Sequence, residues 1–569
     1  MLRLLFPLAL SLCTYSSLTF AQNTDTILHN ARIYTVNEDM PWASSVAIED
    51  GKLTYVGDDE GAKAFQGVTT RVVDMQGQFM LPGFQDAHAH PIFGVAYTSG
   101  CPIFELGSVA AITAEIKRCV AENPDAPHIV GAGWAWDDFP ADQPPNRTML
   151  DAIDSTRPLV FADADGHTQW LNSAALKLAG VNADTADPEG GMIGRDEASG
   201  EANGLLMENS GMELIVNKLP LPTPEQKRVG LEYAQDYFHS LGITAVQEAL
   251  VSVSAPGLYD SLPTYEAWNN EGGLKLRVML ALHWESERGM AQIDDMLAAR
   301  KKYSKGRLQA GQVKFWSDGI LESYTAMMLE PYSDKPETLG LMMVPPEQMM
   351  EAGPILDKAG FALHIHTIGD AAARYALDAI EASQKANGKR DSRHQLVHVQ
   401  MLNPDDVPRF AELGAIANFQ PLWAYGDGYV IDINTPQMGP ERMKQMYPIG
   451  AVANSGGRVA FGSDWSVSSA NPFPAMEIAI TRQDPETSTT PVFNPEQRIS
   501  LEQAIAGYTI DAAFANLIDD TTGSVEVGKY ADLIVVDRNL FEIPVGEISE
   551  ASVSATLFEG EEVYGSLGE

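Results

Sequence analysis

Short apolar runs that end in polar or ionisable residues recur through the middle of the chain and alternate with helical stretches. This pattern predicts parallel βα units. Eight such runs can be counted, the number that closes a barrel: Met80–Ala87, Ile243–Glu248, Leu276–His283, Val313–Asp318, Phe361–His366, Gln395–Val399, Ala415–Phe419 and Arg458–Asp464. The pattern therefore predicts an α/β fold, a (β/α)8 TIM barrel.

The count of eight requires a large insertion after the first strand, at about residues 91–240. This stretch carries apolar segments of its own, Ile129–Trp134 and Leu159–Asp163. We therefore expect the insertion to be a folded lid or subdomain.

The two ends of the chain resemble each other. Near the N-terminus, Ile27–Val36 reads as a strand, and Ser45–Ile48 and Lys52–Val56 flank an Asp50-Gly51 turn typical of a hairpin. Near the C-terminus, 523–537 and 554–564 are again strand-like. The pattern predicts one small β-sandwich assembled from residues 22–80 and 516–569, enclosing a barrel domain of residues 81–515.

A capping box predicts the last helix of the barrel. Ser500 and Gln503 have the spacing at which each side chain caps the other's backbone. We expect a helix from there through Ala515.

The net charge of the chain limits the kinds of partner that it can bind. Lys and Arg number 38 against 77 Asp and Glu, which gives a formal net charge of −39. Nucleic-acid binding or docking on an anionic membrane would need a basic surface. We therefore expect a small-molecule substrate, no nucleic acid, and no membrane contact beyond export.

The first 21 residues predict export. Arg3, the apolar run Leu4–Leu12 and the small residues before Ala21 form a secretory signal with cleavage after Ala21. The run is too short to span a bilayer as a helix. A periplasmic or secreted location follows, in which Cys101 and Cys119 could pair, although the sequence does not fix their separation.

Candidate chemistry begins at the end of the first barrel strand. His88 and His90 stand two residues apart, so on a strand both side chains project to the same side and can hold one cation. Such a pair alone is a weak signal, because two polar residues at the start of a loop look the same.

The other strand ends strengthen that signal. Lys314, His366, His398 and Asp464 stand at or near the ends of the fourth, fifth, sixth and eighth strands, where barrel enzymes place their chemistry. Lys314 has two interpretations: a salt bridge to Asp318 or another acid, or a carboxylated lysine that bridges two metals. A helical zinc motif is not expected at His394 and His398, since no Glu follows His394.

With these residues, the chain resembles the amidohydrolase superfamily, and within it amidohydrolase family 3, the branch that includes N-substituted formamide deformylase. The resemblance covers essentially the whole mature chain. Besides the strand ends, it rests on these segments: Leu81-Pro82-Gly83-Phe84 leading into Asp86-Ala87-His88, Asp165-Gly166-His167 with Leu171-Asn172-Ser173 in the insertion, Gly242-Ile243-Thr244, and 523–533.

The resemblance implies roles for individual residues. His88, His90, His366 and His398 would be metal ligands, Lys314 the bridging ligand if carboxylated, and Asp464 the catalytic base. One or two divalent ions are expected, with zinc first among the candidates. His167 would donate to the developing oxyanion, with a hydrogen bond inside the insertion as an equal alternative. His364 does not fall on a matching position, and Glu248 has no assigned role.

These residues predict an exported metal-dependent amidohydrolase that cleaves a non-peptide C–N bond of amide or formamide type. The metal would activate water to hydroxide, and Asp464 would act as general acid and base. A lactonase, esterase or phosphotriesterase would use the same residues. An inactive binding barrel is the non-enzymatic alternative, against which the intact Asp464 argues. The substrate and the oligomeric state, a homodimer included, stay open.

Overall fold

The computed structural model describes residues 24–567 apart from 141–142, 165, 189, 197, 255–256 and 488–490. The predicted signal peptide, residues 1–21, and Asp165 of the Asp-Gly-His segment lie outside the described residues. Along the described part of the chain, no helix combines the length and the apolar character needed to cross a membrane.

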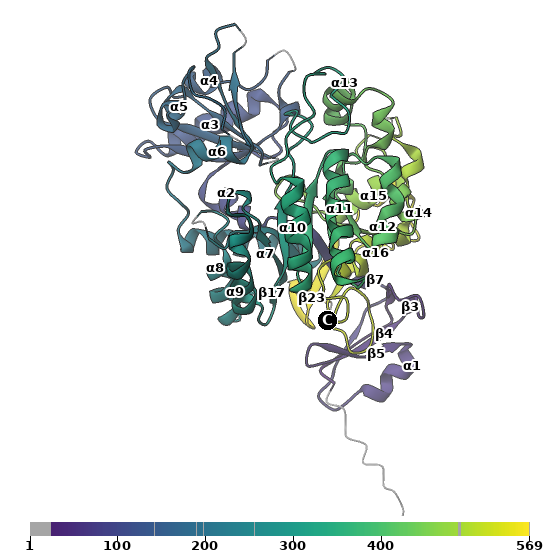
Figure 1. Ribbon diagram of the computed structural model, residues 1–569. Helices are drawn as coiled ribbons and strands as arrows, with labels where there is room; N and C mark the ends of the chain where they lie inside the picture. Colours follow the sequence, from purple (N-terminus) through teal and green to yellow (C-terminus); the bar gives the residue numbers. More distant parts are fainter. Residues whose placement is uncertain are drawn as a thin grey trace, which may run out of the picture.

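An eight-stranded parallel sheet forms the nearly closed central barrel, as predicted (Figure 1). Its strands neighbour one another in chain order: β8 (Phe84–Ala89), β15 (Ile243–Val251), β16 (Arg277–His283), β17 (Leu308–Trp316), β18 (Ala362–Thr367), β19 (Gln395–His398), β20 (Ile416–Phe419) and β21 (Arg458–Phe461). The first and last strands meet at a seam where the Asp464 N–H donates to the His88 carbonyl at 2.7 Å. Almost every residue of these strands is buried, because the barrel interior covers one face and helices the other.

Helices surround the barrel: α7 (Pro224–Ser240), α8 (Leu262–Asn270), α9 (Ile293–Tyr303), α10 (Pro346–Lys358), α11 (Asp370–Asn387), α12 (Val407–Leu413), α14 (Ile449–Asn454), α15 (Pro472–Thr481), α16 (Leu501–Gly507) and α17 (Ile510–Ala515). The predicted capping box opens α16: the Gln503 N–H donates to Ser500 Oγ at 3.2 Å. The helix does not continue to Ala515 as predicted. Thr509, with φ −129° and ψ −96°, breaks it and separates α16 from α17.

The first predicted strand, Met80–Ala87, is two strands. β7 (Phe79–Pro82) pairs antiparallel with β22 (Leu533–Val536) outside the barrel, and β8 begins after Gly83. Gly83 sits where the chain passes from one sheet to the other, and a Cβ there would lie 2.5 Å from Thr244 Oγ1. Only a residue without a side chain allows this close approach.

The insertion between β8 and β15 has its own six-stranded sheet: β9 (Cys101–Pro102), β10 (Ile129–Trp134), β11 (Leu159–Asp163), β12 (Thr168–Leu171), β13 (Met192–Arg195) and β14 (Ala202–Met207). The two apolar segments singled out in the sequence coincide with β10 and β11. Its helices are α3 (Val109–Glu122), α4 (Arg147–Asp151), α5 (Ser173–Ala179) and α6 (Glu208–Val216). Cys101 and Cys119 form a disulfide that joins β9 to α3.

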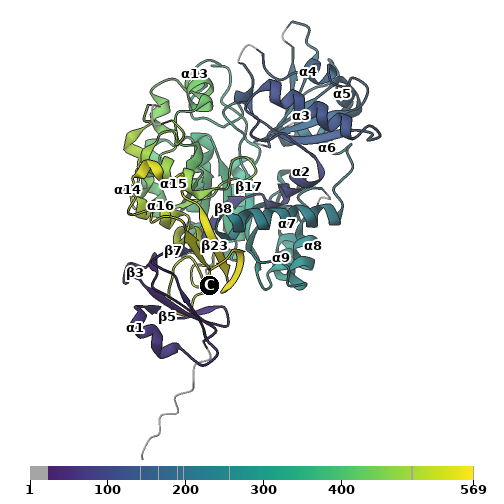
Figure 2. The ribbon, with the colours of Figure 1, turned by 180° about the vertical axis from the view of Figure 1, so that it is seen from behind.

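Both ends of the chain build a pair of small sheets. One sheet contains β5 (Lys52–Gly57), β4 (Ser45–Glu49), β1 (Thr26–His29) and β6 (Arg71–Asp74), in that order. The other is composite, with the order β24 (Glu561–Gly565), β23 (Val553–Phe558), β22, β7, β2 (Arg32–Tyr34) and β3 (Trp42–Ala43). Figures 1 and 2 show these sheets at one end of the barrel and α3 to α6 of the insertion at the other.

The hairpin turn predicted at Asp50-Gly51 is confirmed, with positive φ at both residues, 50° and 75°. The predicted strand Ile27–Val36 is wrong as a single element. Asn30, at φ 55°, bends the chain so that β1 and β2 enter different sheets.

Candidate metal centre

The two histidines of the first barrel strand face the residue that follows the last. His88 and His90 lie at the end of β8, and Asp464 lies three residues beyond β21. Asp464 Oδ1 lies 3.3 Å from His88 Nε2 and 3.2 Å from His90 Nε2. The seam of the barrel therefore brings together residues about 375 positions apart in the chain.

The remaining predicted residues line the same cavity. The His398 ring centroid lies 4.6 Å from that of His366 and 4.9 Å from that of His88. The cavity has a volume of about 50 Å³, and its lining includes all seven residues assigned a role in the sequence: His88, His90, His167, Lys314, His366, His398 and Asp464.

Hydrogen bonds outside the cavity fix how the imidazoles stand. His398 Nδ1 lies 2.8 Å from Gln420 Oε1, and His366 Nε2 lies 3.3 Å from the Gly319 carbonyl oxygen. A carbonyl oxygen only accepts, so each of these ring nitrogens carries the proton, and the opposite nitrogen keeps its lone pair.

His364, left without a ligand role in the sequence, supports His88. Its ring stacks on that of His88 at 4.8 Å, and its Nε2 lies 2.7 Å from His88 Nδ1. This contact leaves His88 Nε2 as the ring nitrogen that faces the cavity.

Two buried polar atoms show that a cation fits here. Among the described residues, His88 Nε2 and Asp464 Oδ1 have no hydrogen-bond partner, although they lie 3.3 Å apart. A cation held by both atoms would satisfy both. The ligand atoms of His88, His90 and Asp464 all lie within 4.8 Å of one another, close enough to hold one ion.

Burial sets the protonation of these groups. It lowers the pKa of His88 and His366 well below the ordinary value and that of His398 to about 3. Burial alone would raise the pKa of Asp464, but the surrounding imidazoles outweigh it and hold that pKa well below its usual range. Neutral imidazoles beside a carboxylate are a donor set for a divalent cation at neutral pH.

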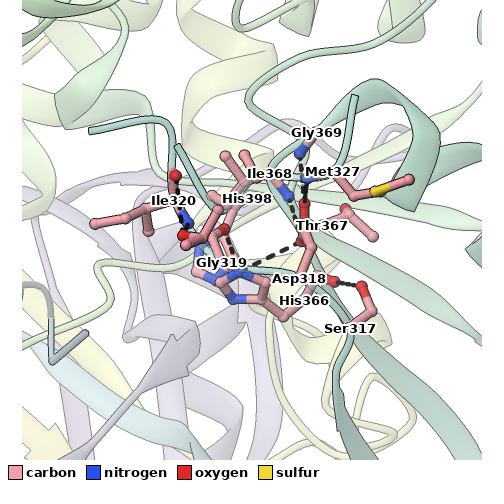
Figure 3. A network of polar contacts seen from close by, with 12 residues as sticks. Ser317, Asp318, Gly319, Ile320, Met327, His366, Thr367, Ile368, Gly369 and His398 are labelled. Atoms are coloured by element: carbon pink, nitrogen blue, oxygen red, sulfur yellow. Dashed lines mark hydrogen bonds and ion pairs between the residues drawn. The ribbon is translucent and has the colours of Figure 1, made fainter. Parts of the chain in front are cut away.

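Lys314 is 3% exposed, and no carboxylate of the described chain forms an ion pair with it. The salt bridge to Asp318, one of its two interpretations, is not formed. Asp318 instead accepts backbone N–H groups from Met327, Ile368 and Gly369 at 2.8–3.1 Å and lies 3.6 Å from His366 Nε2 (Figure 3). Burial lowers the pKa of Lys314 to about 8.

His167 reaches the cavity from the insertion. Its ring centroid lies 4.9 Å from that of Trp316 and 5.6 Å from that of His366, and its Nδ1 lies 2.8 Å from Glu208 Oε2. The hydrogen bond inside the insertion, one of the two alternatives for His167, is formed, and the residue also lines the cavity.

Comparison with known proteins decides the family. The model of the amidohydrolase family matches residues 71–564. The chain belongs to the amidohydrolase family. This amidohydrolase is therefore a metal-dependent hydrolase, and the residues around the cavity fit that requirement.

Relatives match this amidohydrolase over nearly their whole length. Protein LONG AFTER FAR-RED 3 of Arabidopsis thaliana is 31% identical, with 95% of this chain and 91% of the relative covered. N-substituted formamide deformylase of Arthrobacter pascens is 26% identical, over 95% and 98% of the two chains. An uncharacterized metal-dependent hydrolase from Pyrococcus horikoshii shares the fold, with a TM-score of 0.70, 23% identity and coverage of 92% and 99%.

Two residues of the amidohydrolase site were not found from its sequence. Gln420 directly follows β20 and holds His398, and Glu208 directly follows β14 and holds His167. A polar residue just after an apolar strand was the available signal for both. The partner of each, 22 and 41 positions away, was not visible in the sequence.

Proposed function

We propose that this chain hydrolyses a small non-peptide amide of the formamide type, with Asp464 as general acid and base. The placement of Asp464 carries the proposal. Its buried carboxylate lies beside His88 and His90, in a cavity that Lys314, His366 and His398 complete. A carboxylate kept ionised next to the reacting atoms is suited to moving a proton.

The four histidines and Lys314 would hold one or two divalent cations, with zinc the first choice for a site rich in neutral imidazole. When bound, the metal lowers the pKa of water toward about 7 and polarises a carbonyl oxygen. Lys314 would serve as a bridging ligand after carboxylation: its neutral amine attacks CO2, an N–C bond forms and one proton leaves to solvent. A pKa of about 8 keeps part of the Lys314 amine neutral near physiological pH.

The protein's own groups then move protons. Asp464 takes a proton from the attacking water as the water oxygen bonds to the amide carbon. It returns this proton to the amide nitrogen as the C–N bond breaks, so that a carboxylic acid and an amine leave. His167 donates its Nε2–H to the carbonyl oxygen, on which negative charge develops. Because Nδ1–H is bound to the Glu208 carboxylate, this role requires the doubly protonated imidazolium form of the ring.

The size of the cavity favours a small acyl group. Its volume is about 50 Å³, whereas a single water needs about 10–15 Å³. Ala164, Gly166 and His167 of the insertion form part of its wall. A bound cation would take part of this space, so what is left beside the attacking water suits a small acyl group such as formyl, in agreement with the relative named as a deformylase of N-substituted formamides.

We also propose that the protein is exported. The signal-like N-terminus supports this, and so does the Cys101–Cys119 disulfide, since disulfides persist in oxidising compartments. Cell fractionation with N-terminal sequencing tests it. A mature N-terminus at Gln22 in the periplasm or medium is expected, and a cytoplasmic protein that retains Met1 would contradict it.

Metal analysis combined with a substrate panel tests the catalytic proposal. The panel contains N-formyl amines, longer N-acyl amines, esters, lactones and phosphotriesters, each assayed with and without a chelator. We expect chelator-sensitive release of amine, fastest from N-formyl amines. Active protein without metal would overturn the proposal, and faster turnover of lactones or phosphotriesters would replace it with those reactions.

Asp464→Asn tests the proton role, because the amide oxygen of asparagine can still contact a cation whereas the side chain cannot take up a proton. We expect turnover to fall by at least about 10³-fold, at the upper end of what a positioned acid–base group contributes, with metal still bound. Asp378→Asn is the matched control, because Asp378 lies on α11 outside the cavity and pairs with Arg409. Retained activity in Asp464→Asn would refute the assigned role.

A further inference from the structure

Glu208 contacts His167 at two points. The first residue of α6, it is completely buried. Its backbone N–H donates to the His167 carbonyl oxygen at 2.8 Å, and its Oε2 lies 2.8 Å from His167 Nδ1. A carboxylate oxygen is an acceptor, so Nδ1 carries the proton of this contact.

The backbone of Glu208 is strained at this point. Its φ is 59°, in the left-handed region that residues with a β-carbon rarely adopt. Such a conformation is unfavourable for a residue with a β-carbon and persists where surrounding contacts fix it. The two contacts with His167 are contacts that fix the backbone of Glu208 in this conformation.

The second carboxylate oxygen of Glu208 binds the barrel. Thr325 Oγ1 donates to Glu208 Oε1 at 2.5 Å, and Ser323 Oγ lies 3.3 Å from the same oxygen. Thr325 Oγ1 also accepts the Ile320 N–H at 3.0 Å and lies 2.6 Å from Ser323 Oγ, so the two hydroxyls and the carboxylate form one cluster. Both hydroxyls belong to the loop after β17, the strand that carries Lys314.

Gly319 in this loop makes room for the carboxylate. A Cβ at Gly319 would lie 2.6 Å from Glu208 Oε1 and 2.0 Å from Thr325 Oγ1. Any larger residue would push the carboxylate and the hydroxyl apart. The loop is therefore shaped to receive Glu208.

These contacts decide which edge of the His167 ring meets the cavity. Nδ1 is bound to Glu208, so Nε2 lies on the opposite edge of the ring, whose centroid is 4.9 Å from that of Trp316 and 5.6 Å from that of His366; both residues line the cavity. We propose that Glu208 is the positioning residue of His167, and that Thr325 and Ser323 lock this pair to the barrel. The inference rests on the proposed function, in which His167 donates to the substrate carbonyl oxygen.

The arrangement also couples the insertion to catalysis. His167 and Glu208 belong to the insertion, whereas Ser323 and Thr325 belong to the barrel. The His167 ring is therefore correctly aimed only when the insertion is seated on the loop after β17.

A double-mutant cycle between positions 167 and 208 tests the inference. We expect His167→Ala to lower kcat by about 10²-fold, the effect of losing one oxyanion donor. Glu208→Leu should lower kcat by a similar factor with KM changed less than about twofold, and should cause no further loss in the His167→Ala background. Glu208→Gln keeps an acceptor for Nδ1–H but removes the negative charge that favours the imidazolium, so its kcat should fall less than that of Glu208→Leu. Glu213→Gln, on the exposed side of α6, is the control and should match the wild type.

Three results would overturn the inference. The losses of kcat from His167→Ala and Glu208→Leu could multiply in the double variant, the kcat of Glu208→Gln could be as low as that of Glu208→Leu, or Glu208→Leu could keep the wild-type kcat. If Glu208→Leu does not fold, Thr325→Val replaces it in the cycle. We then expect a severalfold loss of kcat in the wild-type background and none in the His167→Ala background, and equal losses in both would refute the lock.

Crystal structures of the Glu208 variants give a readout that does not depend on turnover. We expect the His167 ring to rotate in Glu208→Leu and to keep its orientation in Glu208→Gln. An unchanged ring in Glu208→Leu would overturn the inference even if no amide were hydrolysed. Absence of hydrolysis by the wild type would instead count against the proposed function alone.

Discussion

Glu248 makes the stability of the barrel depend on pH. It lies on β15 with 0% exposure, and Tyr265 of α8 donates its hydroxyl to Glu248 Oε2 at 2.7 Å. Glu248 Oε1 has no hydrogen-bond partner among the described residues. Burial raises the pKa of this carboxyl to about 8, against the lowering effect of the Tyr265 hydrogen bond. The folded protein therefore keeps Glu248 protonated at neutral pH.

The size of the effect follows from linkage. Between pH 4.5 and about 8 the folded state holds a proton on Glu248 that the unfolded state has lost. Each pH unit in this window lowers the free energy of unfolding by about 1.4 kcal/mol, because the unfolded state binds fewer protons. Over the whole window of about 3.5 pH units, the loss is about 5 kcal/mol.

Glu248→Gln removes the titratable proton of the carboxyl group and keeps the size and shape of the side chain. We expect the variant and the wild type to have similar stability near pH 5 and the variant to be more stable by several kcal/mol at pH 9. Guanidinium unfolding of both proteins at half-unit pH steps measures the difference, in which the contributions of other groups cancel. Tyr265→Phe should raise the pKa of Glu248 further and extend the window upward. Parallel stability curves for Glu248→Gln and wild type from pH 5 to 9 would refute the reasoning.

Four further perturbations follow from the structure. Lys314→Ala should lose metal, measured by elemental analysis, and short-chain carboxylates should restore part of the activity; unchanged metal content would argue against a ligand role. Asp532→Asn should lower the free energy of unfolding by less than the about 3–5 kcal/mol of a fully broken buried pair, because Arg277, which is 8% exposed, keeps Glu559 as a second partner at 2.8 Å. Removing the exposed Arg32–Glu542 pair should change stability by less than about 1 kcal/mol in the same unfolding assay. Cys119→Ser should destabilise the insertion by about 3 kcal/mol, as expected for a loop closed across 18 positions; limited proteolysis would show it as faster cleavage between residues 101 and 240.

The barrel could be predicted because its strands are buried on both faces. Runs such as Leu396–Val397 and Val459–Phe461 are apolar without alternation, and a residue with a proposed chemical role, His398 or Asp464, follows each within three positions. The hydrophobic pattern missed the positions at which a single residue changes the direction of the chain. Asn30, Gly83 and Thr509 each redirect the chain inside a stretch whose hydrophobic pattern continues, so periodicity joined elements that the backbone separates.

The site residues that could be predicted from the sequence are those at or near the ends of barrel strands. His88, His90, Lys314, His366, His398 and Asp464 all lie there, and they line one cavity. Gln420, Glu208 and His364 act through a neighbour's ring nitrogen, and that contact exists only after folding. The sequence likewise offered Asp318 as a salt-bridge partner for Lys314, because it could not show that three backbone N–H groups already bind that carboxylate.

Asp86, in the Asp86-Ala87-His88 segment on which the family resemblance rests, does not line the cavity, but it has a structural role at the seam of the barrel. Asp86 Oδ1 accepts the backbone N–H groups of His88 and Ser463, each at 3.0 Å, and its Oδ2 accepts the Ser463 hydroxyl. These bonds join β8 to the segment after β21, where the Asp464 N–H also donates to the His88 carbonyl. One buried carboxylate thereby fixes His88 and Asp464 relative to each other. The distance between a histidine and the proposed general base is thus set by the same contacts that close the barrel, so the site forms only when the first and last strands have met.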